Sequence, residues 1–542
     1  MQRNFRNLSS QVFDVAIIGG GITGACIARD AARRGLSVTL VDKGDFSSGT
    51  SAGSTKLVHG GLRYLRTMEF GLIRESLRER RVWERIAPHM VYPMSFILPL
   101  KKASEKWIIG TGLTLYDLLS FDRNWLPDYD QMMPGHRAIS AAEARQLEPA
   151  LGQATFDSAM LYYDCQMYSP ERLGLECLMD AVAHGAVIAN YAEAFGFTKQ
   201  NGGVHSIRVR DVLTRAEENI RARMVVNAAG PWADRMLELI DGGSSAHKLI
   251  RSKGIHIVTR AVTRSNALAV GHKGGHFFIV PWREHSIIGT TDSVFSEKPD
   301  ELKVTAEEID AFLAFVNDGL PGLNLEPDHV CYAYAGLRPL VDDGSKNSYN
   351  ASRKAEIVDH GGEGGTVNLL SAIGGKWTTS RDIAEKCVNL IVRKLKTSAK
   401  RCDTGDASLP GSAGNHKAKV AALSSSHPEL APSSAANLAR NYGAMSDAVL
   451  ALGKDDPSLL RAVSQRLPDI GAQVAHAVRT EMALTLEDVV FRRTGLGTLG
   501  PLGAAGIGEV AAIMALEMKW SEAEEQRQIA SLNWRYEALV RA

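Results

Sequence analysis

Short apolar runs alternate with helix-compatible segments at the start of the chain. Residues 15–18 form an apolar run of strand length, a helical pattern continues to Arg34, and residues 38–41 form a second short apolar run. Gly35 stands between the helical segment and the second run, and glycine commonly ends helices at such a position. The pattern therefore predicts a strand–turn–helix–strand unit over residues 14–42, as at the start of a parallel sheet.

The turn inside this unit has the sequence Gly19-x-Gly21-x-x-Gly24, and Asp42 follows Gly24 by 18 residues. In dinucleotide-binding proteins the first glycine permits a tight turn, the second lets the backbone approach a pyrophosphate, and the third lets helix and strand pack closely. The helix N-terminus attracts the phosphates, and an acid near the position of Asp42 accepts a bond from the ribose 2′-OH. We predict a dinucleotide site rather than an ordinary glycine-rich turn. The pattern does not distinguish FAD from NAD.

Strand and helix patterns continue along the chain. Residues 68–86 and 171–184 predict helices, residues 221–226 predict a strand, and residues 277–282 and 286–290 predict a β-hairpin. We therefore expect an α/β protein in which an antiparallel sheet accompanies the parallel one over residues 1–402. Residues 403–437 are rich in Ser, Ala, Gly and Pro and predict a linker, and residues 438–542 predict a helical C-terminal domain.

Small residues recur at further places where a cofactor could approach the backbone. Glycine admits close contact because it has no side chain, and Ser or Thr hydroxyls can bind a cofactor. A solvated loop is the alternative for residues 47–55, and a plain glycine-rich helix start is the alternative for residues 374–379. The candidates are Ser51, Thr55, Gly60, Gly61, Ala229, Gly230, Gly375 and Lys376.

Residues 93–121 combine cations with a long apolar, aromatic stretch. Three lysines, Lys101, Lys102 and Lys106, precede a segment that begins at Trp107 and ends at Phe121. The segment is too short to span a membrane. It could lie in the membrane interface with its lysines toward anionic headgroups, or it could be a buried helix.

Composition narrows the class of protein. The chain has 542 residues, enough for two or three domains, and its formal net charge of +1 does not indicate a nucleic-acid partner. The six cysteines are scattered without a CxxC or a Cys/His cluster, which favours a reducing compartment and no metal site. The N-terminal residues lack an apolar signal segment. We expect a cytoplasmic protein, or one that lies against a membrane from the cytoplasmic side.

Seven segments together resemble the FAD-dependent glycerol-3-phosphate dehydrogenases. The resemblance covers nearly the whole chain, and a cysteine-poor sequence fits the aerobic, respiratory branch of that family. It implies a Rossmann-like FAD-binding domain interleaved with a mixed or antiparallel-sheet substrate domain, plus an α-helical C-terminal cap. Family members often carry Glu where this chain has Asp42. The segments are the glycine fingerprint, STKLVHGGLRYL (54–65), VVNAAGPWAD (225–234), IVPW with IIGTTD (279–292), AGLRPL (335–340), GGKWTT (374–379) and EMALTLEDVVFRRTGLG (481–497).

The resemblance also implies a set of site residues. A phosphorylated substrate needs cations, and Arg63, Tyr64, Arg353 and Lys376 are expected to hold the phosphate. Arg338 is expected to orient the oxygen that becomes a ketone. For the base we favour His256, because an imidazole can accept a proton at neutral pH, and His59 is the competing candidate.

These residues predict a function. We expect FAD-dependent oxidation of sn-glycerol 3-phosphate to dihydroxyacetone phosphate by hydride transfer to flavin N5, with electrons passed to a membrane quinone. The enzyme would be peripheral on the inner face of the cytoplasmic membrane, bind no nucleic acid, and could be a homodimer. The alternatives are an oxidase of the same substrate that uses O2, and an amine- or amino-acid-oxidising flavoprotein of the same fold.

Overall fold

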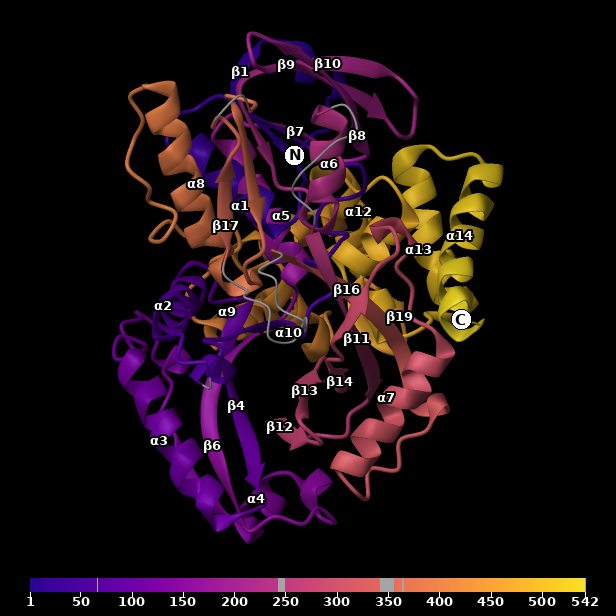
Figure 1. Ribbon diagram of the computed structural model, residues 1–542. Coiled ribbons are helices and arrows are strands. Elements are labelled where there is room, and N and C mark those ends of the chain that lie inside the picture. Colours follow the sequence, from indigo (N-terminus) through magenta and orange to yellow (C-terminus); the bar gives the residue numbers. More distant parts are fainter. Residues whose placement is uncertain (66, 242–248, 342–354, 363–364, 542) are drawn as a thin grey trace.

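The computed structural model describes residues 1–65, 67–241, 249–341, 355–362 and 365–541. These residues form two large sheets and a group of C-terminal helices (Figure 1). The α/β fold expected from the sequence is confirmed, with the two sheets built from interleaved parts of the chain.

The first sheet contains the strand–turn–helix–strand unit. Strands β1 and β2 pair in parallel, and β10 and β18 continue the parallel order on the other side of β1. β1 is apolar and buried along residues 15–18, as expected for a parallel strand covered on both faces. In spatial order the strands are β17 (Glu356–Asp359), β18 (Leu369–Ile373), β10 (Glu217–Asn227), β1 (Val12–Ile18), β2 (Val38–Val41) and β7 (Val187–Ala189), with β8 (Ala192–Gln200) and β9 (Gly203–Asp211) attached through β10.

Helix α1 (Ile22–Arg33) starts directly after the glycine turn. Gly35 follows it with φ +88°, a left-handed conformation that suits glycine, so the predicted helix end is confirmed. Helices α5 (Pro170–Ala183) and α8 (Ser380–Leu395) pack on either side of α1. Their apolar side chains and those of the sheet form one buried cluster that fixes the start of α1.

The second sheet is mainly antiparallel, with β12 and β4 pairing in parallel near its centre. Helix α7 (Ala306–Gly319) buries its apolar face against this sheet. In spatial order the strands are β15 (Ser293–Phe295), β11 (Leu249–Arg260), β14 (His285–Gly289), β13 (Gly275–Trp282), β12 (Ala267–His272), β4 (Val91–Leu100), β6 (Ser158–Met167) and β3 (Leu57–Val58), with β16 (Val330–Val341) on β11 and β5 (Arg137–Ser140) on β6.

The predicted hairpin is strands β13 and β14. Trp282 faces His285 across the turn, and Arg283 and Glu284 between them both have positive φ. Positive φ at both central residues is the conformation of a tight two-residue hairpin turn. The helices predicted over residues 68–86 and 171–184 are α2 (Phe70–Ile86) and α5.

Residues 93–121, for which an interfacial segment and a buried helix were the alternatives, fall into two parts. Their first part completes β4, an inner strand of the second sheet, and only the second part is a helix, α3 (Ala103–Leu119). Leu113 and Tyr116 are buried in α3, whereas Trp107 and Ile108 are 80% and 72% exposed. The alternative of a buried helix is therefore wrong. Figure 1 shows α3 along the outer edge of the molecule, beside β4 and β6.

The segment expected as a linker, residues 403–437, also differs. It contains α9 (His416–Ser426) and most of α10 (Pro432–Asn441), and Leu409, Leu423 and Leu430 are buried. Its Ala and Ser residues are small enough to pack helices closely, and composition alone does not reveal this. The later helices are α11 (Ser446–Leu450), α12 (Gly471–Thr480), α13 (Gly503–Met518) and α14 (Glu522–Arg541).

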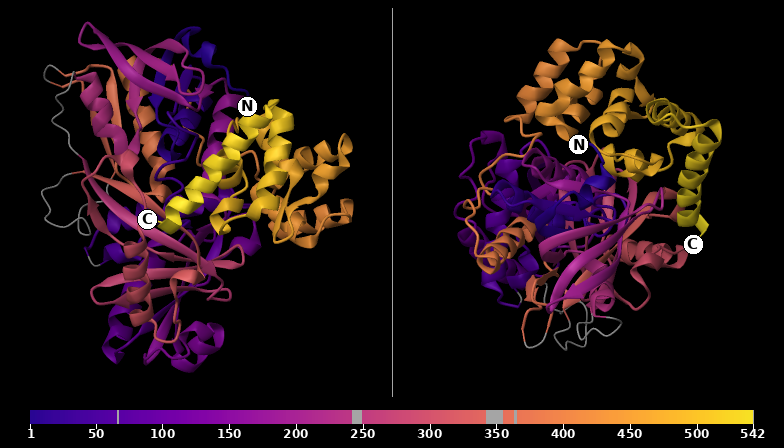
Figure 2. Two further views of the ribbon diagram at one scale, coloured as in Figure 1. Left: turned by 90° about the vertical axis from the view of Figure 1, so that its right-hand side faces the viewer. Right: turned by 90° about the horizontal axis from the view of Figure 1, so that it is seen from above.

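The C-terminal helices form a cap on one side of the two sheets (Figure 2). A buried cluster joins the cap to the second sheet through Trp282 and Tyr332 on the sheet side and Val474 and Phe491 on the cap side. In the part of the chain that the structure describes, no helix is long and apolar enough to cross a membrane.

Candidate cofactor and substrate site

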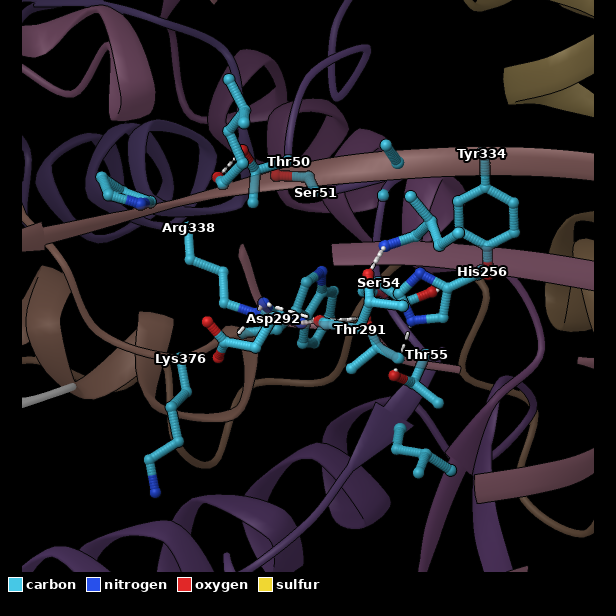
Figure 3. Close-up of a pocket in the computed structure, with 18 of the residues that line it drawn as sticks. Thr50, Ser51, Ser54, Thr55, His256, Thr291, Asp292, Tyr334, Arg338 and Lys376 are labelled. Carbon is cyan, nitrogen blue, oxygen red and sulfur yellow. Dashed lines mark hydrogen bonds and ion pairs between the residues drawn. The ribbon is translucent and has the colours of Figure 1, made fainter. Parts of the chain in front are cut away.

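A cavity of about 2690 Å³ extends from the glycine turn of the first sheet to the face of the second. Single ligand sites usually have volumes of about 300–1,000 Å³. The cavity is therefore large enough for an extended cofactor together with a substrate. Figure 3 shows polar side chains of the cavity from the loop that follows β2, from β11 and β16, from the segment between β14 and β15, and from the segment before α8.

The glycine turn leaves backbone, not side chains, at one end of the cavity. Gly19 has φ +108°, and a Cβ there would lie 2.5 Å from the Ala228 carbonyl oxygen. A Cβ on Gly24 would lie 1.9 Å from the Gly19 carbonyl oxygen. The Ile22 N–H donates to Ser51 Oγ at 2.9 Å, which ties the helix start to the following loop. This arrangement matches the separate tasks of the fingerprint glycines and fits the pyrophosphate of a dinucleotide.

Asp42 lies at the end of β2 beside this turn. One of its carboxylate oxygens accepts from the Gly20 N–H at 2.7 Å and the other from the Gly44 N–H at 2.9 Å. Burial raises the pKa of Asp42 to about 6, although these two N–H groups act to lower it. A carboxylate has about four acceptor positions, so capacity remains for a ribose hydroxyl.

The double glycine after β3 is held from behind by a buried carboxylate. The Gly60 N–H donates to Asp164 at 3.1 Å, and Asp164 also accepts from Tyr116 of α3 and from Arg80 of α2, the latter at 2.6 Å. A Cβ on Gly60 would lie 2.3 Å from the Tyr116 hydroxyl oxygen, so only glycine fits. The loop that presents His59 and Gly61 to the cavity is therefore fixed by α2 and α3.

Two cations contact the ring of Tyr64. Arg63 and Lys376 lie over its ring at 4.9 and 4.2 Å from the centroid, and Lys376 Nζ donates to Ser76 Oγ at 2.7 Å. A Cβ on Gly61 would lie 3.2 Å from Lys376 Nζ, so these groups converge beside the double glycine. Such a cluster suits a dianionic phosphate. Arg353, the fourth expected phosphate ligand, lies outside the described residues.

Arg338 projects from β16 across its neighbour β11. It donates to Ser252 Oγ at 3.1 Å and to Thr290 Oγ1 at 3.0 Å, and its guanidinium lies 3.7 Å from the Asp292 carboxylate. A Cβ on Gly254 would lie 2.3 Å from Arg338 Nη2, so the glycine of β11 makes room for the guanidinium. Figure 3 shows Arg338, Thr291 and Asp292 together in the cavity.

His256 lies on β11 with its ring stacked on Tyr334, the ring centroids being 4.9 Å apart. Its Nε2 is 2.9 Å from Thr55 Oγ1, and its Nδ1 is buried without a hydrogen-bond partner among the described residues. Burial lowers the pKa of His256 well below its usual range, and the charges of Arg338 and Lys56 lower it further. The imidazole is therefore neutral at physiological pH, and its surroundings oppose its protonation.

The structure brings the candidates together. In the described part of the chain, every candidate named from the sequence lines this one cavity except Gly24 and Gly60, which support its wall from behind. Sequence reasoning missed the groups that hold these residues in place, including Ser252, Gly254, Asp164 and Tyr334. Asp292 also holds Arg338 in place, and of these groups it alone could have been noticed in the sequence, because it ends the GTTD motif that follows the hairpin.

Comparisons with known proteins identify the family of this chain. Residues 14–381 match the FAD dependent oxidoreductase family model, and residues 402–525 match the C-terminal domain of alpha-glycerophosphate oxidase. A glycerol-3-phosphate dehydrogenase of Synechocystis is 35% identical, covering 97% of each chain. A D-erythritol 1-phosphate dehydrogenase of Brucella abortus is 33% identical, covering 89% of this chain and 94% of that one. The FAD complex of the Bacillus halodurans glycerol-3-phosphate dehydrogenase superposes with a TM-score of 0.77 at 28% identity, covering 98% of this chain and 96% of that one.

Fold and site define a flavin-dependent oxidoreductase, and the chain belongs to the FAD dependent oxidoreductase family. The resemblance to FAD-dependent glycerol-3-phosphate dehydrogenases is confirmed. FAD is therefore the dinucleotide. The cavity fits it, because the glycine turn in its wall suits the pyrophosphate and its volume is large enough for an extended cofactor.

The environment of Asp42 predicts a pH dependence for FAD binding. If a ribose hydroxyl donates to Asp42, bound FAD stabilises the ionised carboxylate, whose pKa without FAD is about 6. Raising the pH from about 5 to 7 should then raise FAD affinity about tenfold, measured by fluorescence titration of the apoprotein. Asp42→Asn should bind FAD more weakly and without this dependence. An equal pH dependence in the variant would contradict the assignment.

Proposed function

We propose that the enzyme oxidises sn-glycerol 3-phosphate to dihydroxyacetone phosphate and passes the electrons to a membrane quinone. The observation that carries the proposal is a cavity with two polar groups of different character. Arg63, Tyr64 and Lys376 form a cationic group, whereas His256 and Arg338 form a group suited to proton and oxygen chemistry.

The cationic group suits the phosphate of the substrate. Arg63 and Lys376 supply charge, and the Tyr64 hydroxyl, which already accepts from Arg63 at 3.2 Å, supplies a further polar contact. Several cations favour a phosphate near charge −2, whereas a carboxylate substrate needs only one arginine. This argues against the amino-acid-oxidising alternative.

The second group suits the oxidation of a secondary alcohol. His256 would accept the hydroxyl proton at Nε2, the nitrogen next to Thr55, while Arg338 would hold the oxygen as it becomes a carbonyl. FAD supplies the two-electron acceptor at N5. His59 remains the alternative base, because it lines the same cavity beside the double glycine.

An apolar part of the cavity supports a quinone as the electron acceptor. Phe96 and Leu98 of β4, Ile108 and Ile109 of α3, and Phe278 of β13 line it. Glycerol 3-phosphate is polar and gains little from apolar contacts, whereas a quinone ring is apolar and can bind against such a lining. An oxidase would need access only for O2.

Helix α3 supports a peripheral position on the membrane. Besides Trp107 and Ile108, Leu118 and Phe121 are 65% and 62% exposed, and three lysines lie at the start of the helix. An exposed apolar surface beside cations is typical of helices that lie in the interface of an anionic membrane. Because Ile108 also lines the cavity, a quinone in the membrane would reach the cavity directly.

The D-erythritol 1-phosphate dehydrogenase relative raises a second phosphorylated polyol as a candidate substrate. The cationic group suits both substrates, because they share the phosphate. Comparison of the two compounds in flavin reduction decides between them.

Arg338 provides the first test of the mechanism. Arg338→Leu should slow flavin reduction by sn-glycerol 3-phosphate more than about 100-fold, because a contact that strengthens in the transition state is lost. The measurement is anaerobic stopped-flow, with FAD content checked for each variant. Arg338→Lys is the matched control, since it keeps the positive charge but not the two-pronged donor geometry of the guanidinium. Its rate of flavin reduction should fall less. A near-normal rate for Arg338→Leu would show that the residue has another role.

Helix α3 provides the second test. The double variant Trp107→Glu, Ile108→Glu should leave anionic vesicles and lose electron transfer to ubiquinone embedded in them, because two carboxylates replace apolar contacts. Its flavin should still be reduced by the substrate. Leu516→Glu on α13, where Leu516 is 76% exposed, is the control and should stay bound. Equal vesicle binding by the unsubstituted enzyme, the double variant and Leu516→Glu would refute the interfacial role. Peroxide formation in place of quinone reduction would favour the oxidase.

A further inference from the structure

A buried carboxylate joins the cofactor-binding loop to the C-terminal cap. Asp45 lies three residues after Asp42 and is 1% exposed. It accepts from Arg492 Nε at 2.6 Å and from Arg493 Nη1 and Nη2 at 2.8 and 2.9 Å. It also accepts from Asn190 at 2.9 Å. Both arginines belong to the EMALTLEDVVFRRT segment of the cap, in which Glu487 lines the cavity whereas Arg492 and Arg493 do not.

The Asp45 loop is part of the cofactor site through its backbone. The Ser47 N–H donates to the Gly20 carbonyl oxygen at 3.0 Å, and Asp42 links Gly20 to Gly44 through its two oxygens. Lys43, Gly44 and Ser48 line the cavity, whereas Asp45 points away from it into the cap. A displacement of Asp45 would therefore change the shape of the glycine turn.

The charges around Asp45 are balanced. Three arginines, Arg172, Arg492 and Arg493, meet three carboxylates, Asp45, Glu481 and Asp488, and all six side chains are buried. The arginines hold the pKa of Asp45 well below its usual range, against the effect of burial. Buried charge pairs of this kind hold their side chains in one arrangement, because a buried charge left without its partner strongly destabilises the fold.

We propose that Arg492 and Arg493 are positioning residues for FAD. Through Asp45 they hold the loop of residues 42–48 in the shape that receives the ADP half of the cofactor. The cap is then part of the cofactor site although residues 488–494, among those that the structure describes, do not line the cavity. Because coupling is reciprocal, bound FAD should in turn stabilise this segment of the cap.

Two variants of the full-length protein separate this role from simple attachment of the cap. Asp45→Asn removes the charge through which the loop pairs with Arg492 and Arg493. Glu481→Gln removes an equally buried charge that pairs with Arg172 of α5, and with Arg493 only at 4.0 Å, but not with the loop. Both change the network by one charge. Each apoprotein is titrated with FAD by fluorescence, and its thermal unfolding is recorded.

Asp45→Asn should raise the Kd for FAD about tenfold or more, while Glu481→Gln lowers the unfolding temperature but leaves the Kd within about threefold of the original. An unchanged Kd for folded Asp45→Asn would overturn the proposal. Equal loss of FAD affinity in both variants would also overturn it, because attachment of the cap in general would then hold the cofactor.

Hydrogen exchange of the unsubstituted protein tests the same claim without a variant that could fail to fold. Adding FAD to the apoprotein should slow amide exchange in peptides that cover residues 488–494. Peptides from α9 are the control and should not change, because α9 contacts neither the loop nor the cavity in the described part of the chain. Equal exchange of residues 488–494 with and without FAD would contradict the proposal.

Discussion

The site depends on one point where the backbone of a loop from the first sheet contacts the backbone of a strand in the second sheet. Gly53, in the loop that leaves the first sheet, packs on Gly336 of β16, and a Cβ on Gly336 would lie 2.2 Å from the Gly53 carbonyl oxygen. Hydrogen bonds flank this contact, from Thr50 Oγ1 to the Leu337 carbonyl oxygen at 2.6 Å and from the Tyr334 hydroxyl to the Ser54 carbonyl oxygen at 2.8 Å. The cofactor loop and the strand that carries Arg338 are thus joined, so that FAD and substrate share one cavity.

Local patterns in the sequence predicted the parts of this arrangement that depend on neighbours along the chain. Strands β1 and β2, the end of α1 at Gly35 and the β13–β14 hairpin follow from short-range periodicity and turn chemistry. The candidate site residues came largely from family motifs, because an isolated arginine or histidine in a sequence carries no information about what it faces.

The remaining features depend on contacts between distant segments. Nothing in the sequence around Asp164 or Asp45 shows that one anchors the double glycine and the other meets two arginines from the cap. Residues 403–437 were expected as a linker because small residues are common in linkers and in tightly packed helices alike. Residues 93–100 form an inner strand because β6 and β12 lie beside them, which the apolar run could not reveal.

The central claim is that the enzyme oxidises a phosphorylated polyol with FAD in this cavity. Anaerobic mixing of the oxidised enzyme with sn-glycerol 3-phosphate, with glycerol and with a D-amino acid tests it most directly. The account predicts that sn-glycerol 3-phosphate bleaches the visible absorbance of the flavin, and that glycerol, which leaves Arg63 and Lys376 without an anion, does so more than about 100-fold more slowly. Bleaching by the D-amino acid but not by sn-glycerol 3-phosphate, or equal rates with glycerol, would contradict it.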